Sequence, residues 1–129
     1  MVVDASALIE VLLRTSNATV VEERLFGAGE TLHVPYLIDI ETAQVVRRYA
    51  AGGEIDDSRG LAALGDLADF PMRRYPHDFL LQRVWDLRHN LTAYDAVYVA
   101  LAEALDATLL TRDRRLAAAS GHRARIEMV

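Results

Sequence analysis

Two aspartates, Asp95 and Asp113, lie near the ends of a mostly apolar stretch, TAYDAVYVALAEALDATLLTRDRRL (92–116). A carboxylate is costly to bury unless a hydrogen-bond donor or a cation compensates its charge, so this placement needs a cause. Asp4, directly after the apolar start of the chain, and Glu41, in a later helical stretch, pose the same problem. Carboxylate oxygens are ligands of Mg²⁺ and Mn²⁺, which can activate water for attack on a phosphodiester. The four acids therefore indicate metal-dependent hydrolysis.

The composition excludes several other kinds of chemistry. The chain has no cysteine, which excludes disulfides, a thiol nucleophile and a cysteine-ligated zinc site. All 14 of its Lys and Arg residues are arginine, so Schiff-base catalysis and a P-loop lysine are excluded as well. The formal net charge of −5 argues against broad non-specific binding to nucleic acid. A nucleic-acid substrate held locally by a metal and a few arginines remains compatible with that charge.

Strands and helices alternate along the sequence, and its 129 residues are the usual size of one domain, so we expect a single domain over 1–129. The alternation predicts an α/β fold in which helices cover both faces of a mostly parallel sheet. Short apolar runs predict strands at 1–3, 32–34, 70–75 (an edge strand, since prolines interrupt it), 108–110 and 125–129. Helical periodicity predicts helices at 5–14, 18–26, 36–51, 56–68, 79–88, 94–105 and 112–119.

These elements bring the four carboxylates to one edge of the sheet. The helix at 94–105 descends about 16 Å, and the strand after it climbs back roughly 13–16 Å, so Asp95 and Asp113 lie at the same level. Asp4 directly follows the first strand, and Glu41 lies in the first turns of the helix after the second strand. Open α/β folds bind ligands beyond the carboxyl ends of their strands. Because no lysine is available to neutralise converging carboxylates, a divalent cation is the natural partner.

Helix capping offers a second explanation for the three aspartates. Thr92 and Asp95 have the spacing of a capping box with Asp in place of Glu. Thr111 could cap the next helix, with Asp113 in its favourable first turn. Asp4 could be the N-cap of the first helix.

Glu41 has no capping explanation, but an ion pair with an arginine such as Arg48 could account for it. Asp39, two residues earlier, is a competing acid on a different side of the same helix. All of these separate explanations would have to hold at once for the convergence to be accidental, so we favour the metal site.

Three segments, VVDASALI (2–9), VPYLIDIETAQVVRR (34–48) and LTAYDAVYVALAEALDATLLTRDRRL (91–116), resemble the acidic motifs of PIN-domain ribonucleases. The resemblance is strongest to the VapC-type toxins of bacterial toxin–antitoxin pairs. It covers nearly the whole chain, with the motifs in order. It implies the PIN-like three-layer fold, a Mg²⁺- or Mn²⁺-dependent endoribonuclease acting on RNA, a homodimer and a cognate antitoxin protein.

Carried over by position, the resemblance assigns roles to particular side chains. The acidic catalytic set is Asp4, Glu41, Asp95 and Asp113, of which Asp4, Asp95 and Asp113 hold the metal, while Glu41 helps to hold it or orients the attacking water. Ser6 and Thr111 match the small hydroxyl positions beside this set, where they contact the ligands or metal-bound water. Three arginines that flank Asp113 are candidates for contact with RNA phosphates, or form a solvated helix face: Arg112, Arg114 and Arg115.

Other classes of protein fit less well. A receiver domain needs a lysine, and a haloacid-type phosphatase has Asp-x-Asp after its first strand, where this chain has Asp4-Ala5-Ser6. A PIN-fold binding module without catalysis stays open as the alternative. Trp85 and Tyr98 lie in apolar helical patterns and are expected in the core. The start of the chain is too short and too charged for a signal peptide or membrane span, so we expect a cytoplasmic protein without a membrane partner.

Overall fold

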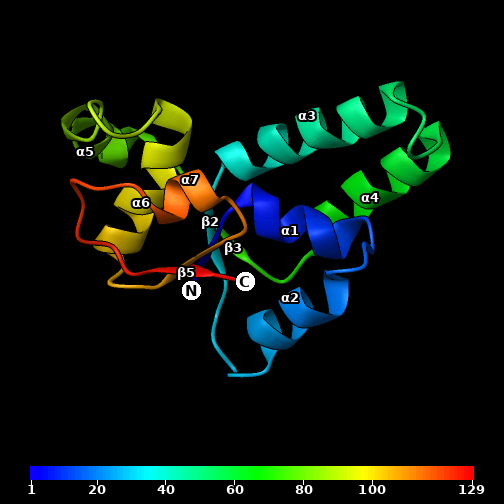
Figure 1. Ribbon diagram of the computed structural model, residues 1–129, viewed down its shortest axis with the longest axis horizontal. Coiled ribbons are helices and arrows are strands. Elements are labelled where there is room, and N and C mark those ends of the chain that lie inside the picture. Colours follow the sequence, from blue (N-terminus) through cyan, green and yellow to red (C-terminus); the bar gives the residue numbers. More distant parts are fainter.

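Five short parallel strands form the centre of the computed structural model, which describes residues 1–129 (Figure 1). Their order is β3-β2-β1-β4-β5, and every neighbouring pair is parallel. The bounds are β1 (Val2–Val3), β2 (His33–Pro35), β3 (Arg73–Tyr75), β4 (Leu109–Thr111) and β5 (Ile126–Met128). The first strand of the chain is therefore the central strand, and the residue that follows it, Asp4, leaves the middle of the sheet.

Helices cover the sheet on both faces, which confirms the expected three-layer α/β architecture. In Figure 1, α5 and α6 lie on one side of the strands, and α1, α2, α3 and α4 lie on the other. The short α7 packs beside β4 and β5. The bounds are α1 (Ala5–Leu12), α2 (Ala18–Phe26), α3 (Leu37–Ala51), α4 (Asp57–Asp69), α5 (Leu81–Asp86), α6 (Ala93–Ala104) and α7 (Arg114–Ala117). None of these helices is both long and apolar enough to cross a bilayer.

The main hydrophobic core lies between β1, β4 and the helices α1 and α6. Val2 and Val3 are wholly buried, as expected for a central strand of a parallel sheet. Every residue of α6 from Ala96 to Ala102 is buried, which agrees with the nearly uninterrupted apolar sequence of that helix. The most apolar helix therefore fixes the position of the aspartate in its own first turn.

Three helices are shorter than the sequence predicts. The first ends at Leu12 because Arg14 adopts a left-handed conformation with φ 52°. The segment expected as one helix at 79–88 is a 3₁₀ turn, Asp78–Leu80, followed by the six-residue α5. The last helix is limited to Arg114–Ala117 because Asp113 has an extended backbone and acts as its N-cap.

Candidate active site

Asp4 lies at the end of the central strand and has a buried carboxylate, only 6% exposed. It occupies the N-cap position of α1, but its side chain makes no capping hydrogen bond. Instead, Oδ2 accepts hydrogen bonds from Ser6 Oγ at 2.6 Å and from Thr111 Oγ1 at 2.7 Å. Burial raises the pKa of Asp4, the two hydroxyls oppose the rise, and the charge of Asp113 adds to it. The capping explanation is therefore wrong for Asp4.

The Ser6 and Thr111 hydroxyls join the ends of β1 and β4 around Asp4. Their oxygens lie 3.2 Å apart, and Ser6 Oγ also accepts a hydrogen bond from the backbone N–H of Arg112 at 2.9 Å. Thr111 is completely buried and accepts from the backbone N–H of Asp113 at 2.9 Å. These hydroxyls consequently fix the orientation of the Asp4 carboxylate and tie it to the loop that carries Asp113.

Asp95 lies in the first turn of α6, where only half of a capping box forms. Thr92 Oγ1 accepts a hydrogen bond from the backbone N–H of Asp95 at 3.2 Å, so Thr92 is the cap. The half-buried carboxylate of Asp95 has its pKa raised first by burial and then by the charges of Asp4 and Asp113, while Arg115 lowers it. Asp95 is therefore close enough to Asp4 and Asp113 for their negative charges to raise its pKa.

Asp113 is itself the N-cap of α7, a role that the sequence suggested for Thr111. Its Oδ1 accepts hydrogen bonds from the backbone N–H groups of Arg115 at 2.8 Å and Leu116 at 3.4 Å. No protein donor reaches Oδ2, and the charge of Asp113 raises the pKa of both Asp4 and Asp95. Asp113 therefore caps α7 through one oxygen and is at the same time close enough to Asp4 and Asp95 to raise their pKa values.

Glu41 reaches the same cluster from α3. Burial raises its pKa to about 7, and the charges of Asp4 and Asp95 contribute in the same direction. Its Oε2 accepts a hydrogen bond from the hydroxyl of Tyr98 at 3.0 Å, and no arginine forms an ion pair with it. The ion pair with Arg48 that the sequence allowed is therefore absent.

The competing acid Asp39 points elsewhere, because the guanidinium of Arg74 binds both of its oxygens at 2.9 Å. Of the two aromatic residues predicted to lie in the core, Trp85 is 65% exposed, because the short α5 that carries it buries none of its residues, so that prediction is wrong. Tyr98 was also assigned only to the core. It is in the core, yet it follows Asp95 by three positions and so shares a face of α6 with it. A hydroxyl on the face that carries an active-site acid was the available signal.

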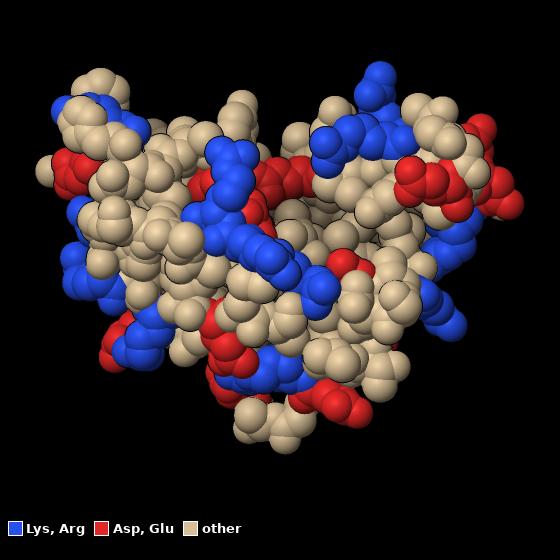
Figure 2. All heavy atoms as spheres, in the orientation of Figure 1, with Lys and Arg blue, Asp and Glu red and all other residues tan.

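The three candidate arginines differ in how they are engaged. The Arg112 guanidinium lies 3.2 Å from Glu10 and donates to the carbonyl of Val129 at 2.6 Å, so it is not free to bind phosphate. Arg114 and Arg115 are exposed and have no acidic partner within ion-pair distance. A cavity of about 400 Å³ beside them is lined by residues that include Asp95 and Arg115. Figure 2 shows acidic atoms in a notch between α3 and α7, with basic side chains along its near rim.

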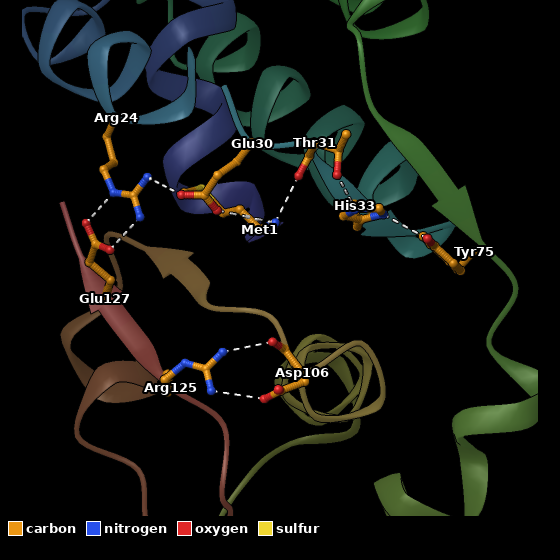
Figure 3. Close-up of polar contacts among 9 residues, drawn as sticks. All are labelled: Met1, Arg24, Glu30, Thr31, His33, Tyr75, Asp106, Arg125 and Glu127. Atoms are coloured by element: carbon orange, nitrogen blue, oxygen red, sulfur yellow. Dashed lines mark hydrogen bonds and ion pairs between the residues drawn. The ribbon is translucent and has the colours of Figure 1, made fainter. Parts of the chain in front are cut away.

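The opposite edge of the sheet provides a contrast, because its acids are paired with arginine (Figure 3). Arg24 binds Glu127 through Nε at 2.6 Å and Glu30 through Nη1 at 3.1 Å, and Arg125 binds Asp106 at 3.0 Å. At the carboxyl edge, none of the four clustered carboxylates takes part in an ion pair. The four carboxylates of the cluster therefore lie together without an ion pair, unlike Glu127, Glu30 and Asp106.

A hydrated divalent cation fits this donor set. All the available ligands are oxygens, and three of the carboxylates have raised pKa values that a nearby positive charge would reverse. Mg²⁺ retains several of its waters and binds through one or two carboxylates, so it does not require a closed cage of protein ligands.

The raised pKa of Glu41 predicts how stability depends on pH in EDTA. The pKa rises from 4.5 to about 7 on folding, so the folded protein binds more protons than the unfolded chain between these values. The free energy of unfolding should therefore fall as the pH rises from 4.5 to 7, by on the order of 1–2 kcal/mol after allowing for solvent screening. Thermal unfolding of the wild type and of Glu41→Gln over this range measures it, and identical pH profiles would contradict the prediction.

Comparisons with known proteins agree with this geometry. The PIN domain family matches residues 1–121. Ribonuclease VapC12 of Mycobacterium tuberculosis is 40% identical over 129 residues, covering 100% of this chain and 98% of that protein. Ribonuclease VapC1 of the same organism is 42% identical over 129 residues, with 99% and 96% covered. The crystal structure of VapBC2 from Rickettsia felis, bound to a promoter DNA fragment, has the same fold, with a TM-score of 0.71 at 12% identity and coverage of 98% and 96%. The chain therefore belongs to the PIN-domain family, within its VapC-type ribonucleases.

Proposed function

We propose that this chain is a Mg²⁺- or Mn²⁺-dependent endoribonuclease that hydrolyses RNA phosphodiester bonds as the toxin of a toxin–antitoxin pair. The observation that supports metal dependence most directly is the cluster of four carboxylates without an arginine partner at the carboxyl edge of the sheet. Cleavage of a labelled RNA by the purified protein, with Mg²⁺ and with EDTA, tests the proposal. Undiminished cleavage in EDTA would overturn the metal-dependent mechanism.

The aspartates would hold the metal, each from a different element. Asp4 follows β1, Asp95 begins α6 and Asp113 follows β4, so their separation is fixed by the sheet and by the core beneath α6. The metal, when bound, would polarise the phosphate and lower the pKa of a coordinated water. The hydroxyls of Ser6 and Thr111 hold the Asp4 carboxylate in one orientation, which would prepare this one ligand to receive a cation.

Glu41 is suited to accept a proton from the attacking water. In the absence of a cation the pKa of Glu41 is about 7, so its carboxyl is partly protonated at neutral pH. A positive charge at the cluster would lower that pKa, so Glu41 would be ionised at neutral pH when the site is loaded. Glu41 would thus orient the water and take its proton, while the aspartates remain committed to the cation.

RNA would approach along the rim that α7 and the start of α6 form. Arg115 lines the cavity of about 400 Å³ together with Asp95, and it has no acidic partner of its own. Arg88 and Asn90, on the loop before α6, line the same cavity. Guanidinium groups match the geometry of phosphate oxygens, so a phosphate next to the scissile bond has a donor here despite the net charge of −5.

Replacing Arg115 by alanine should weaken RNA binding without removing the chemistry. We expect KM to rise severalfold with kcat little changed, and the slope of log binding constant against log salt to become shallower by about one. Arg125→Ala is the matched control, because it removes the same charge at the far edge of the sheet, where Arg125 pairs with exposed Asp106 (Figure 3). Equal salt slopes in the two variants would contradict the role given to Arg115.

Two protein partners form part of the proposal. The name VapBC2 of the similar Rickettsia felis structure supports an antitoxin partner. An antitoxin could bind in the cavity of about 560 Å³ between α1, α2 and α4, or in the acidic notch. Large apolar side chains are exposed at the start of α3, on the 3₁₀ turn and α5, and at the start of α6, and they support a homodimer: Tyr36, Ile40, Phe79, Leu81, Trp85 and Tyr94. Sedimentation of the free protein and of its complex with the antitoxin measures both assemblies.

A further inference from the structure

A tyrosine hydroxyl lies beneath the acidic cluster, at the end of a fully buried side chain. Tyr98 has no exposed surface, and its ring belongs to the main hydrophobic core. Its hydroxyl donates to Glu41 Oε2 at 3.0 Å. A phenylalanine would fill the same space without requiring a partner for a buried polar atom, so the packing alone does not explain the hydroxyl.

The hydrogen bond links two helices that belong to different layers. Tyr98 is on α6, which packs on α5 and on the strands, whereas Glu41 is on α3, which packs on α1 and α4. No other hydrogen bond or ion pair reaches the Glu41 carboxylate, so Oε1 has no protein partner. The Tyr98 hydroxyl is therefore the single polar contact that sets the direction of Glu41.

The hydroxyl acts only as a donor in this environment. Burial and the neighbouring carboxylates of Glu41, Asp4 and Asp95 raise the pKa of Tyr98, so its proton stays in place at any working pH. A donor fixed at one carboxylate oxygen leaves the other oxygen available to the cluster. Hydrogen bonds to a charged group are also stronger than those between neutral groups, which makes this contact a firm restraint.

We propose that Tyr98 is a positioning residue for the hydrolysis reaction, holding Glu41 by Oε2 so that Oε1 is presented to the aspartates and to the attacking water. This inference rests on the proposed function of the site. It predicts that the Tyr98 hydroxyl affects the rate of hydrolysis only through its hydrogen bond to Glu41.

A double-mutant cycle tests this coupling. Tyr98→Phe should lower kcat about tenfold with KM for RNA nearly unchanged, and should reduce the rise in melting temperature caused by Mg²⁺. Glu41→Gln should lower kcat further. In the Glu41→Gln background, Tyr98→Phe should add nothing to either measurement, because the carboxylate on which it acts is gone. Tyr75→Phe is the matched control, since it removes a phenol hydrogen bond of 2.8 Å to His33, which is not part of the acidic cluster (Figure 3).

The outcomes separate this inference from the function on which it rests. If the wild-type protein shows no Mg²⁺-dependent cleavage of RNA, the proposed function itself is contradicted. An active wild type, with Tyr98→Phe matching Tyr75→Phe in kcat and in the Mg²⁺-induced shift, would overturn the role of Tyr98 alone. Additive losses in the cycle would also overturn it, because they would mean that the hydroxyl affects only packing. Thermal unfolding in EDTA identifies a variant that fails to fold. If Tyr98→Phe does not fold, the kcat and the Mg²⁺-induced shift of Glu41→Gln test the same hydrogen bond through its acceptor.

Discussion

Replacing Asp4 by asparagine should reduce RNA cleavage by about a thousandfold, the loss expected when a main metal ligand loses its charge. Asp4 is the most buried of the four acids, and two hydroxyls hold its Oδ2. Asparagine has nearly the same shape, and its carbonyl oxygen can still accept those hydrogen bonds. The change therefore removes the negative charge while leaving the local geometry in place. Cleavage rates at saturating RNA and Mg²⁺ measure the effect.

The same substitution should make the protein more resistant to heat in EDTA. Burial raises the pKa of Asp4, which means that the folded protein disfavours its charged form, and asparagine carries no charge. An inactive but stabilised variant cannot be explained by unfolding. Asp106→Asn, at an acid whose side chain is 90% exposed at the far edge, is the matched control and should remain active. Activity of Asp4→Asn close to that of the control would exclude Asp4 as a ligand.

Mg²⁺ should raise the melting temperature of the wild-type protein and have little effect on Asp95→Asn. At ten times its Kd, a ligand that binds only the native state stabilises it by about 1.4 kcal/mol, which raises the melting temperature by roughly 5 °C for a chain of this size. In EDTA, Asp95→Asn should itself be more stable than wild type by about 1 kcal/mol, because it removes repulsion from Asp4 and Asp113.

This measurement separates the metal site from helix capping without any assay of activity. Thr92 rather than the Asp95 carboxylate caps α6, so the cap survives the substitution. Four melting curves are needed, for wild type and Asp95→Asn, each with EDTA and with excess Mg²⁺. Equal Mg²⁺-induced shifts in the two proteins would remove Asp95 from the set of ligands.

Most of the helices and strands, and the proximity of the four acids, could be predicted from local patterns in the sequence. The uninterrupted apolar sequence of α6 and the short strand after it return Asp113 to the level of Asp95, as the rise per residue requires. The position of Asp4 followed from the apolar strand directly before it. Such features depend on periodicity and on chain geometry, both of which can be obtained directly from a sequence.

Side-chain partners could not be predicted in the same way, because they depend on contacts between distant segments. Arg112 is bound by Glu10 and by the carbonyl of Val129, which adjoin it only after β5 pairs with β4 and α1 packs on the sheet. Tyr98 meets Glu41 across 57 positions of sequence. The shortened last helix reflects a local competition, since Asp113 satisfies free amides as a cap instead of continuing the helix.

The central position of β1 also determines when the cleavage centre can exist during synthesis. β1 is made first, but it pairs with β4, and Asp4 receives its hydrogen bond from Thr111, 107 positions later. A ribosome adding about 5–20 residues per second needs roughly 5–20 s to cover that distance. Until then the growing polypeptide lacks both the sheet that orients Asp4 and the carboxylate of Asp113. The four carboxylates can therefore come together only after nearly the whole chain has been synthesised.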